Sequence, residues 1–168
     1  YNVLEQPFAA IYLATKELAR MAEMTAAMIV ETKKAFLGND LETAHKVIET
    51  DLIINNLRDK IVKYLSSIFP VETVTEHQSV TISGLMHVVS DIEHIGDNCK
   101  DIANFAVDKI AKGYSFSDSA CAEIYQCFDH SSKMVSDSIE ALNTGNTLLA
   151  RHVKEQQEEM ADMEEHLW

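Results

Sequence analysis

Helical periodicity is the feature that most limits what this chain can fold into. Apolar residues recur at spacings of three and four almost throughout, and no stretch alternates between apolar and polar residues. Only five glycines and two prolines occur in 168 residues, so little interrupts long helices. The pattern predicts an all-α fold, an antiparallel bundle of about five long helices. The expected helices are Phe8–Leu37, Leu41–Phe69, Val74–Lys112, Ser119–Leu142 and Thr147–Trp168.

Residues that end or begin helices separate these elements. Gly38 and Asn39 are expected to end the first helix, and Pro70 the second. Thr73 followed by Glu76 predicts a capping box at the start of the third helix. The short connections that result favour neighbouring helices that run antiparallel.

An internal repeat relates the two halves of the chain. A shift of 106 residues places the first two expected helices on the last two without a gap, and Gly38-Asn39 then falls on Thr144-Gly145. Matched pairs include Met28 with Met134, Ala35 with Ala141, Ala44 with Ala150 and Val47 with Val153. The unit has three helices, and the second copy has two. We therefore expect a complete three-helix repeat at residues 1–113 and a truncated second repeat, a helical hairpin, at residues 114–168. The uncovered apolar surface of the hairpin permits a homodimer.

Charge and composition exclude several classes of function. The formal net charge is −13, from 27 acidic and 14 basic residues, which argues against binding nucleic acid or anionic lipid. No apolar stretch reaches the ~20 residues of a membrane span, so we expect no insertion of these residues into a membrane. The three cysteines form no zinc pattern. No P-loop, GxSxG or HExxH motif occurs, so we expect no enzyme.

An acidic row on the third expected helix is the strongest candidate for a site. Glu93, Asp97 and Asp101 stand at spacing i, i+4, i+8, which stacks three carboxylates along one helix face. No Lys or Arg of the helix is expected at the centre of the row. Carboxylate oxygens suit iron, manganese, magnesium or calcium, so the row predicts half of a metal site. The alternative is an acidic face in water.

Further residues could complete such a site or contact a partner. On the third helix these are His87, Asp91 and His94. On the second helix they are Asp51 and Asn55, beside the apolar stripe. For Asp51 the alternative is an ion pair with Arg58 or with a neighbouring helix. The pairs Glu42/His45 and Asp91/His94 also mimic the Glu-x-x-His spacing of ferritin-like di-iron enzymes, which would require both pairs in the bundle interior.

These motifs resemble the PhoU family. The segment Asp91-Ile-Glu-His-Ile-Gly-Asp-Asn98 is similar to the acidic signature of the family, with Glu93 and Asp97 at its two signature positions. Asp101-Ile-Ala-Asn104 resembles its continuation. Val47 to Asp51, followed by spaced aliphatic residues, resembles the second helix of the family. The opening, Gln6 to Met21, resembles the segment that follows the membrane part of bacterial sodium/phosphate cotransporters.

The resemblance implies an all-helical regulatory domain in phosphate handling and no enzyme. It implies a cytoplasmic location, tethered to the inner membrane in the whole protein. The implied partners are the membrane part of the transporter or phosphate-regulation proteins. Some members bind metal clusters through two acidic signatures, one per repeat, and the second signature is absent here. A ferritin-like di-iron enzyme and a ligand-free helical scaffold or interaction module are the alternatives.

Overall fold

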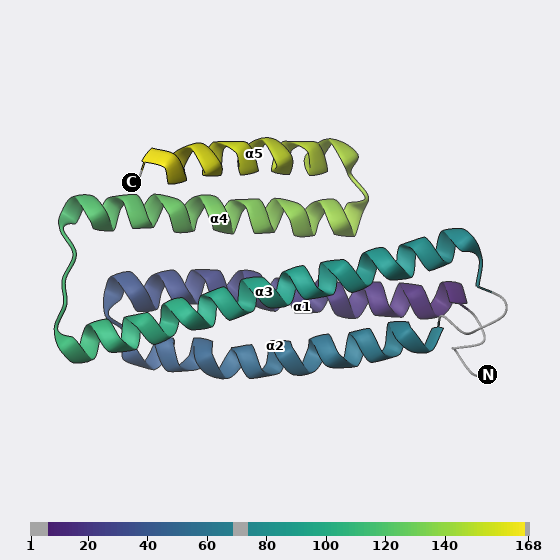
Figure 1. Cartoon of the computed structure of the whole chain (residues 1–168), viewed down its shortest axis with the longest axis horizontal. Coiled ribbons are helices and arrows are strands. Elements are labelled where there is room, and N and C mark those ends of the chain that lie inside the picture. The colour runs from purple at the N-terminus through teal and green to yellow at the C-terminus, as the bar shows by residue number, and fades with distance from the viewer. Residues whose placement is uncertain (1–6, 69–73, 167–168) are drawn as a thin grey trace.

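Five α-helices account for most of the described residues. The computed structural model describes residues 7–68 and 74–166, without the side chains of residues 159 and 162–166. The helices are α1 (Pro7–Gly38), α2 (Leu41–Ile68), α3 (Glu76–Lys112), α4 (Asp118–Thr144) and α5 (Thr147–His166). Figure 1 shows them side by side along one long axis, with consecutive helices running in opposite directions. The expected all-α antiparallel bundle is confirmed, and none of the described residues forms a strand.

The start of α3 differs from its prediction by two residues. Thr75 is the N-cap, its hydroxyl accepts from the Gln78 backbone N–H, and the Gln78 side chain accepts from the Thr75 backbone N–H. Thr73, the expected cap, lies outside the described residues, as does Pro70. Glu76 is the first helical residue and not the third, so the expected capping box was wrong. Thr75 and Gln78 have the same sequence spacing and form the box instead.

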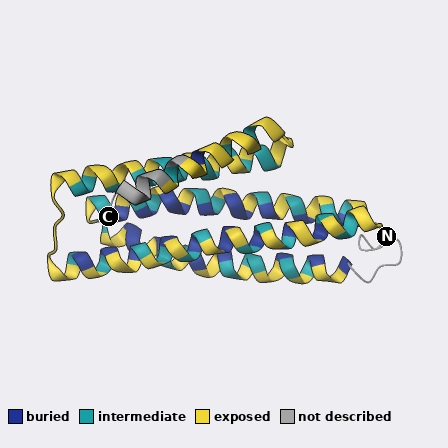
Figure 2. Cartoon of the chain, turned by 45° about the horizontal axis from the view of Figure 1, so that its top comes forward, coloured by how far each residue is buried: buried dark blue, intermediate teal, exposed yellow. Residues whose placement is uncertain are grey.

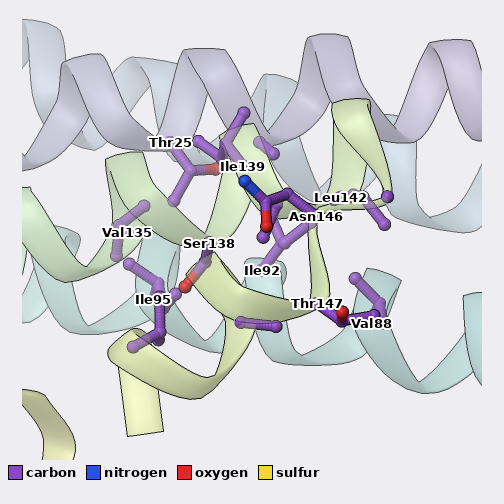
Figure 3. A pocket seen from close by; sticks show the side chains of 15 residues that line it. Thr25, Val88, Ile92, Ile95, Val135, Ser138, Ile139, Leu142, Asn146 and Thr147 are labelled. Atoms are coloured by element: carbon purple, nitrogen blue, oxygen red, sulfur yellow. The ribbon is translucent and has the colours of Figure 1, made fainter. Parts of the chain in front are cut away.

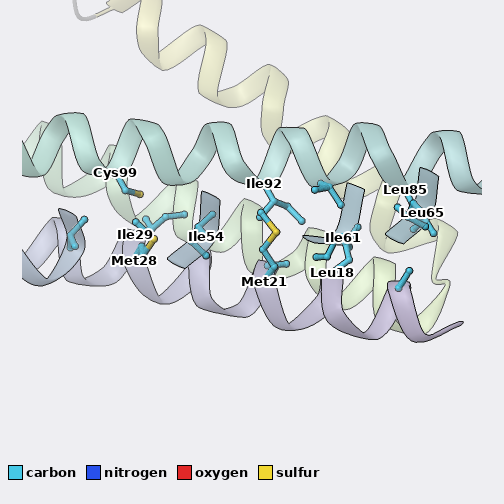
Figure 4. Packing of buried hydrophobic residues seen from close by; sticks show 14 of the residues in the cluster. Leu18, Met21, Met28, Ile29, Ile54, Ile61, Leu65, Leu85, Ile92 and Cys99 are labelled. Atoms are coloured by element: carbon cyan, nitrogen blue, oxygen red, sulfur yellow. The ribbon is translucent and has the colours of Figure 1, made fainter. Parts of the chain in front are cut away.

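The hydrophobic core lies between α1, α2 and α3, which all pack against one another. Each helix buries one stripe at helical spacing, because its apolar residues return to the same face every three or four positions. Figure 4 shows this layer, with Leu18, Met21 and Met28 of α1 facing Ile54 and Ile61 of α2 under α3. Complete burial of each such side chain stabilises the fold by about 1.5–3 kcal/mol.

Phe36 and Lys109 join the carboxyl ends of α1 and α3. The buried Lys109 ammonium donates a hydrogen bond to the Phe36 carbonyl oxygen at 2.6 Å and lies 4.7 Å from the centre of the Phe36 ring. The Phe36 ring also packs against the rings of Phe105, Phe116 and Phe128. Because α1 has no basic residue in its own last turn, Lys109 supplies the cation that a helix carboxyl end favours.

The hairpin of α4 and α5 attaches to the first three helices through α1. α4 packs on α1, and α5 packs on α4. At the α1–α4 contact, the Lys33 ammonium lies 3.1 Å from Asp129 and 3.4 Å from the centre of the Tyr125 ring. No described residue of α4 is buried. Figure 2 shows the same contrast, with buried residues concentrated in α1, α2 and α3.

The connection between α1 and α2 and the connection between α4 and α5 have matching local structure. α1 ends at Gly38 and α4 at Thr144, and the following residues, Asn39 and Gly145, have positive φ values of 52° and 67°. Asp40 and Asn146 then accept hydrogen bonds from the first backbone N–H groups of α2 and α5. The register expected for the internal repeat therefore holds at this turn. The division of the chain between residues 113 and 114 stays a prediction.

Candidate functional site

Six polar side chains meet where α2 packs against α3. We call them the α2–α3 polar cluster: Asp51, Asn55 and Arg58 on α2, and Glu93, Asp97 and Lys100 on α3. Both helices place their members at i, i+4 and i+7, with an acid first and a base last. Because the two helices run antiparallel, the first residue of each triplet meets the last residue of the other (Figure 1). The cluster is therefore held by two reciprocal ion pairs across the interface.

Lys100 forms the first of these pairs. Its ammonium donates to Asp51 Oδ2 at 3.1 Å and also to Asp97 Oδ1. The hydrogen bond from Lys100 lowers the pKa of Asp97, and the bonds to Asp97 and Asp51 raise the pKa of Lys100. The prediction that no basic residue of this helix lies at the centre of the acidic row was wrong. Lys100 follows Asp97 by three residues, which brings its side chain within reach of that carboxylate.

Asp51 is the most deeply buried member of the cluster, with 1% of its surface exposed. Its Oδ2 accepts from Lys100 and from Asn55 Nδ2, which lies 3.1 Å away. Its Oδ1, like Asn55 Oδ1, has no hydrogen-bond partner among the described residues. The opposing residue on α3 is Gly96, where a Cβ would lie 3.8 Å from Asp51 Oδ1. A buried carboxylate with one unpaired oxygen depends strongly on its remaining donors.

Arg58 forms the second pair. Its Nη2 donates to Glu93 Oε1 at 3.1 Å, and its Nη1 contacts Asp59 at 2.9 Å. The hydrogen bond to Glu93 raises the pKa of Arg58. The alternative of an ion pair between Asp51 and Arg58 was therefore wrong, and the alternative of an ion pair between Asp51 and a neighbouring helix is confirmed. Each base reaches across to the other helix because the two triplets are antiparallel.

The acidic row of α3 passes from the interface to the solvent. Glu93 is buried, Asp97 is half-buried and Asp101 is exposed. Four residues correspond to about 400° on an α-helix, so a row at i, i+4, i+8 turns by about 40° at each step. Three residues offer ligand atoms that lie within 4.8 Å of one another: Glu93, His94 and Asp97. The structure thus brings two of the three expected metal ligands together and adds one of the two histidines.

The other expected residues of α3 lie outside that group. His87, Asp91 and Asp101 are all exposed. Asp51 and Asn55 join the cluster from α2 through Lys100 and through their own hydrogen bond. A role for the three exposed residues in binding stays a prediction.

A ferritin-like di-iron arrangement does not form. Such a centre requires Glu42, His45, Asp91 and His94 to project into the bundle interior. All four residues are exposed. The apolar stripes of α2 and α3 turn these positions outward, so this alternative was wrong.

Residues 18–106, which contain the α2–α3 polar cluster, match a known protein family. A family model described as the PhoU domain matches residues 18–106, which is more than half of the chain. The chain belongs to the PhoU family. The matched segment includes all six residues of the α2–α3 polar cluster. No curated protein and no solved structure matches the chain. The PhoU family is a family of regulatory domains associated with phosphate transport.

Sequence reasoning missed the part played by Lys100 in this PhoU domain. The available signal was the equal spacing of the two triplets, an acid followed at i+7 by a base, on helices joined by a short connection.

Within the described part of the chain, no helix is both long enough and apolar enough to cross a membrane.

Proposed function

We propose that this PhoU domain is the cytoplasmic regulatory domain of a sodium/phosphate cotransporter, in which it docks on the membrane part or on a phosphate-regulation protein. The PhoU match over residues 18–106 carries the proposal, because it covers the acidic signature. The resemblance of Gln6–Met21 to the segment after the membrane part of such transporters supports the tether to the inner membrane. The acidic surface of α3 would contact a cation or a basic patch on the partner.

Glu93, His94 and Asp97 would supply the first ligands of the cation. Two carboxylates with one imidazole suit iron or manganese better than magnesium or calcium, which prefer oxygen ligands alone. Arg58 and Lys100 already pair with Glu93 and Asp97, so a divalent ion would compete with two cations of the protein itself. We therefore expect modest affinity, with the remaining ligands coming from solvent or from the partner.

Manganese titration by calorimetry tests the cation role. Glu93→Gln/Asp97→Asn removes two carboxylates of the group and should abolish binding. The matched control is Glu76→Gln/Asp108→Asn, which removes the same charge from exposed positions of the same helix that lie outside the predicted site. Equal loss in both variants, or no binding by the unmodified chain, would contradict a defined cation site. The acidic surface would then serve partner docking alone.

Sodium-driven phosphate uptake tests the regulatory role. The reading frame that precedes Tyr1 should encode membrane-spanning helices, and this can be established by sequencing. In cells that express the whole protein, Glu93→Gln/Asp97→Asn should change the dependence of uptake on phosphate supply, and Glu76→Gln/Asp108→Asn should not. An adjoining reading frame without membrane spans would refute the cotransporter assignment and leave the PhoU family intact.

A further inference from the structure

Exposed basic and aromatic side chains gather at one end of the bundle, on the first turns of α1 and the last turns of α2. Figure 1 shows these turns at the same end of the molecule. We call this surface the α1–α2 basic face and define it by six exposed residues: Phe8, Tyr12, Leu13 and Lys16 on α1, and Lys60 and Lys63 on α2. Phe8 lies one turn before Tyr12, and Lys63 lies three residues after Lys60, so each shares a side of its helix with its neighbour.

Two shallow hollows join these side chains into one surface. Residues of α1 and α2 line the first hollow, which has a volume of about 450 Å³ and includes Leu13 and Lys60. The second hollow lies beside the carboxyl end of α4 and includes Tyr12 and Lys16. Arg20 lines both hollows, so the face continues from α2 across α1.

The charge of this face is opposite to that of the whole chain. Residues 7–23 and 60–68 contain four bases and two acids, whereas the chain contains 14 bases and 27 acids. Neither Lys60 nor Lys63 forms an ion pair with a described residue. The Lys16 ammonium lies 5.2 Å from the centre of the Tyr12 ring. The net charge of −13 argues against anionic lipid for the chain as a whole, but the local excess of cations reverses that argument at this face.

The aromatic rings of the face extend into solvent. Phe8 is 79% exposed and Tyr12 is 54% exposed. Tyrosine and lysine each combine an apolar body with a polar tip, which suits a boundary between apolar and aqueous surroundings. Aromatic and basic side chains on one exposed helix face are typical of helices that lie in the interface of a membrane.

We propose that the α1–α2 basic face docks on the surface of an anionic phospholipid bilayer, with its two aromatic rings at the level of the head groups and its lysines against the lipid phosphates. An acidic protein surface would also attract the lysines. A hydrated acidic surface would not take two apolar rings out of water, whereas the head-group region of a bilayer does. The rings therefore favour a bilayer as the partner.

The chemistry of this face differs from that of the other sites of the molecule. Figure 3 shows a hollow between α3 and the hairpin of α4 and α5, and no charged side chain lines it. That hollow offers no cation to a lipid phosphate. The proposal also does not depend on the cation site or on the cotransporter assignment, because no residue of the α2–α3 polar cluster belongs to the face.

Vesicle flotation tests the role of the lysines. The unmodified chain should bind vesicles of equal parts phosphatidylglycerol and phosphatidylcholine at low salt, and should not bind phosphatidylcholine alone. Lys60→Glu/Lys63→Glu should weaken binding at least about 20-fold, because each basic residue near an anionic bilayer strengthens binding about fivefold. The matched control is Lys133→Glu/Lys154→Glu, which makes the same change of charge at exposed positions of α4 and α5. It should weaken binding by less than about threefold, since those charges lie away from the bilayer and are screened.

The same assay tests the role of the rings. Phe8→Ser/Tyr12→Ser should weaken binding to the anionic vesicles at least about tenfold, because it removes the apolar area that the head groups would cover. The matched control is Leu52→Ser/Val80→Ser, which removes side chains that are 68% and 66% exposed elsewhere on α2 and α3. This control should bind like the unmodified chain.

Three results would overturn the proposal, provided that circular dichroism shows each protein to be folded. One is no binding of the unmodified chain to the anionic vesicles at low salt. Another is equal weakening by the two lysine variants, which would mean that net charge alone governs binding. The last is unchanged binding by the aromatic variant, which would leave only attraction between charges and point to an acidic protein surface as the partner.

Discussion

Replacing Lys100 with methionine should destabilise this PhoU domain by about 3 kcal/mol, the lower end of the range for breaking a buried ion pair. The Asp51 carboxylate is 1% exposed and receives two hydrogen bonds, from Lys100 and Asn55, both at 3.1 Å. Its second oxygen has no partner among the described residues. The Lys100 side chain is 29% exposed, so solvent offsets part of its loss, and we therefore take the lower value.

Urea unfolding followed by circular dichroism measures this effect. For a domain of this size, a loss of about 3 kcal/mol corresponds to a fall in Tm of about 6–12 °C. Asp51→Asn/Lys100→Met should recover at least half of the loss, because it removes the unpaired buried charge. Lys112→Met breaks an exposed pair with Asp108 and should cost at most about 0.5 kcal/mol. A loss below about 1 kcal/mol for Lys100→Met, or no recovery in the double variant, would refute the buried ion pair.

Three further predictions concern other parts of the fold. Lys109→Met removes the buried hydrogen bond to the Phe36 carbonyl and should cost about 1.5–3 kcal/mol in the same urea assay. An unchanged urea midpoint would mean that Lys109 only covers the surface. Gly84→Ala, at an exposed interior position of α3 with no atom within 4 Å of the new Cβ, should raise stability by about 1 kcal/mol, and a lower Tm would contradict this. Hydrogen bonds from the Thr43 backbone and side chain, and from Lys34, lower the pKa of Asp40 from 3.8 to about 2, so its stabilising effect is complete above pH 4 and is lost as the pH falls toward 2. Asp40→Asn keeps the N-cap, so its free energy of unfolding should fall less between these pH values than that of the unmodified protein. An equal fall in both proteins would exclude Asp40 as the cause.

The helices and their turns could be predicted from the sequence because their causes are local. The apolar period, the scarcity of Gly and Pro, and residues such as Gly38 and Asn39 act within one or two turns of the chain. The repeat register at Gly38 and Thr144 followed from the same local pattern. The N-cap of α3 was placed two residues too early because both Thr73 and Thr75 begin a sequence that fits the capping rule.

The acidic site could be predicted only in part. The spacing of Glu93 and Asp97 identified one helix face, and the helical geometry of that face is local. It could not show that Glu93 is buried and that Asp101 is in solvent. That difference depends on where α2 crosses α3, and the crossing depends on the packing of both apolar stripes.

The sequence by itself determined which residues are helical, where the chain turns and which positions share a helix face. The tertiary structure alone decided which charges meet. Lys100 pairs with Asp51, and Arg58 with Glu93, because α2 and α3 lie antiparallel at one particular register. It also decided that Leu142 is only half-buried while its counterpart Phe36 is buried. Helix formation depends on hydrogen bonds within four residues, whereas burial and ion pairing between helices depend on atoms that are tens of residues away in the chain.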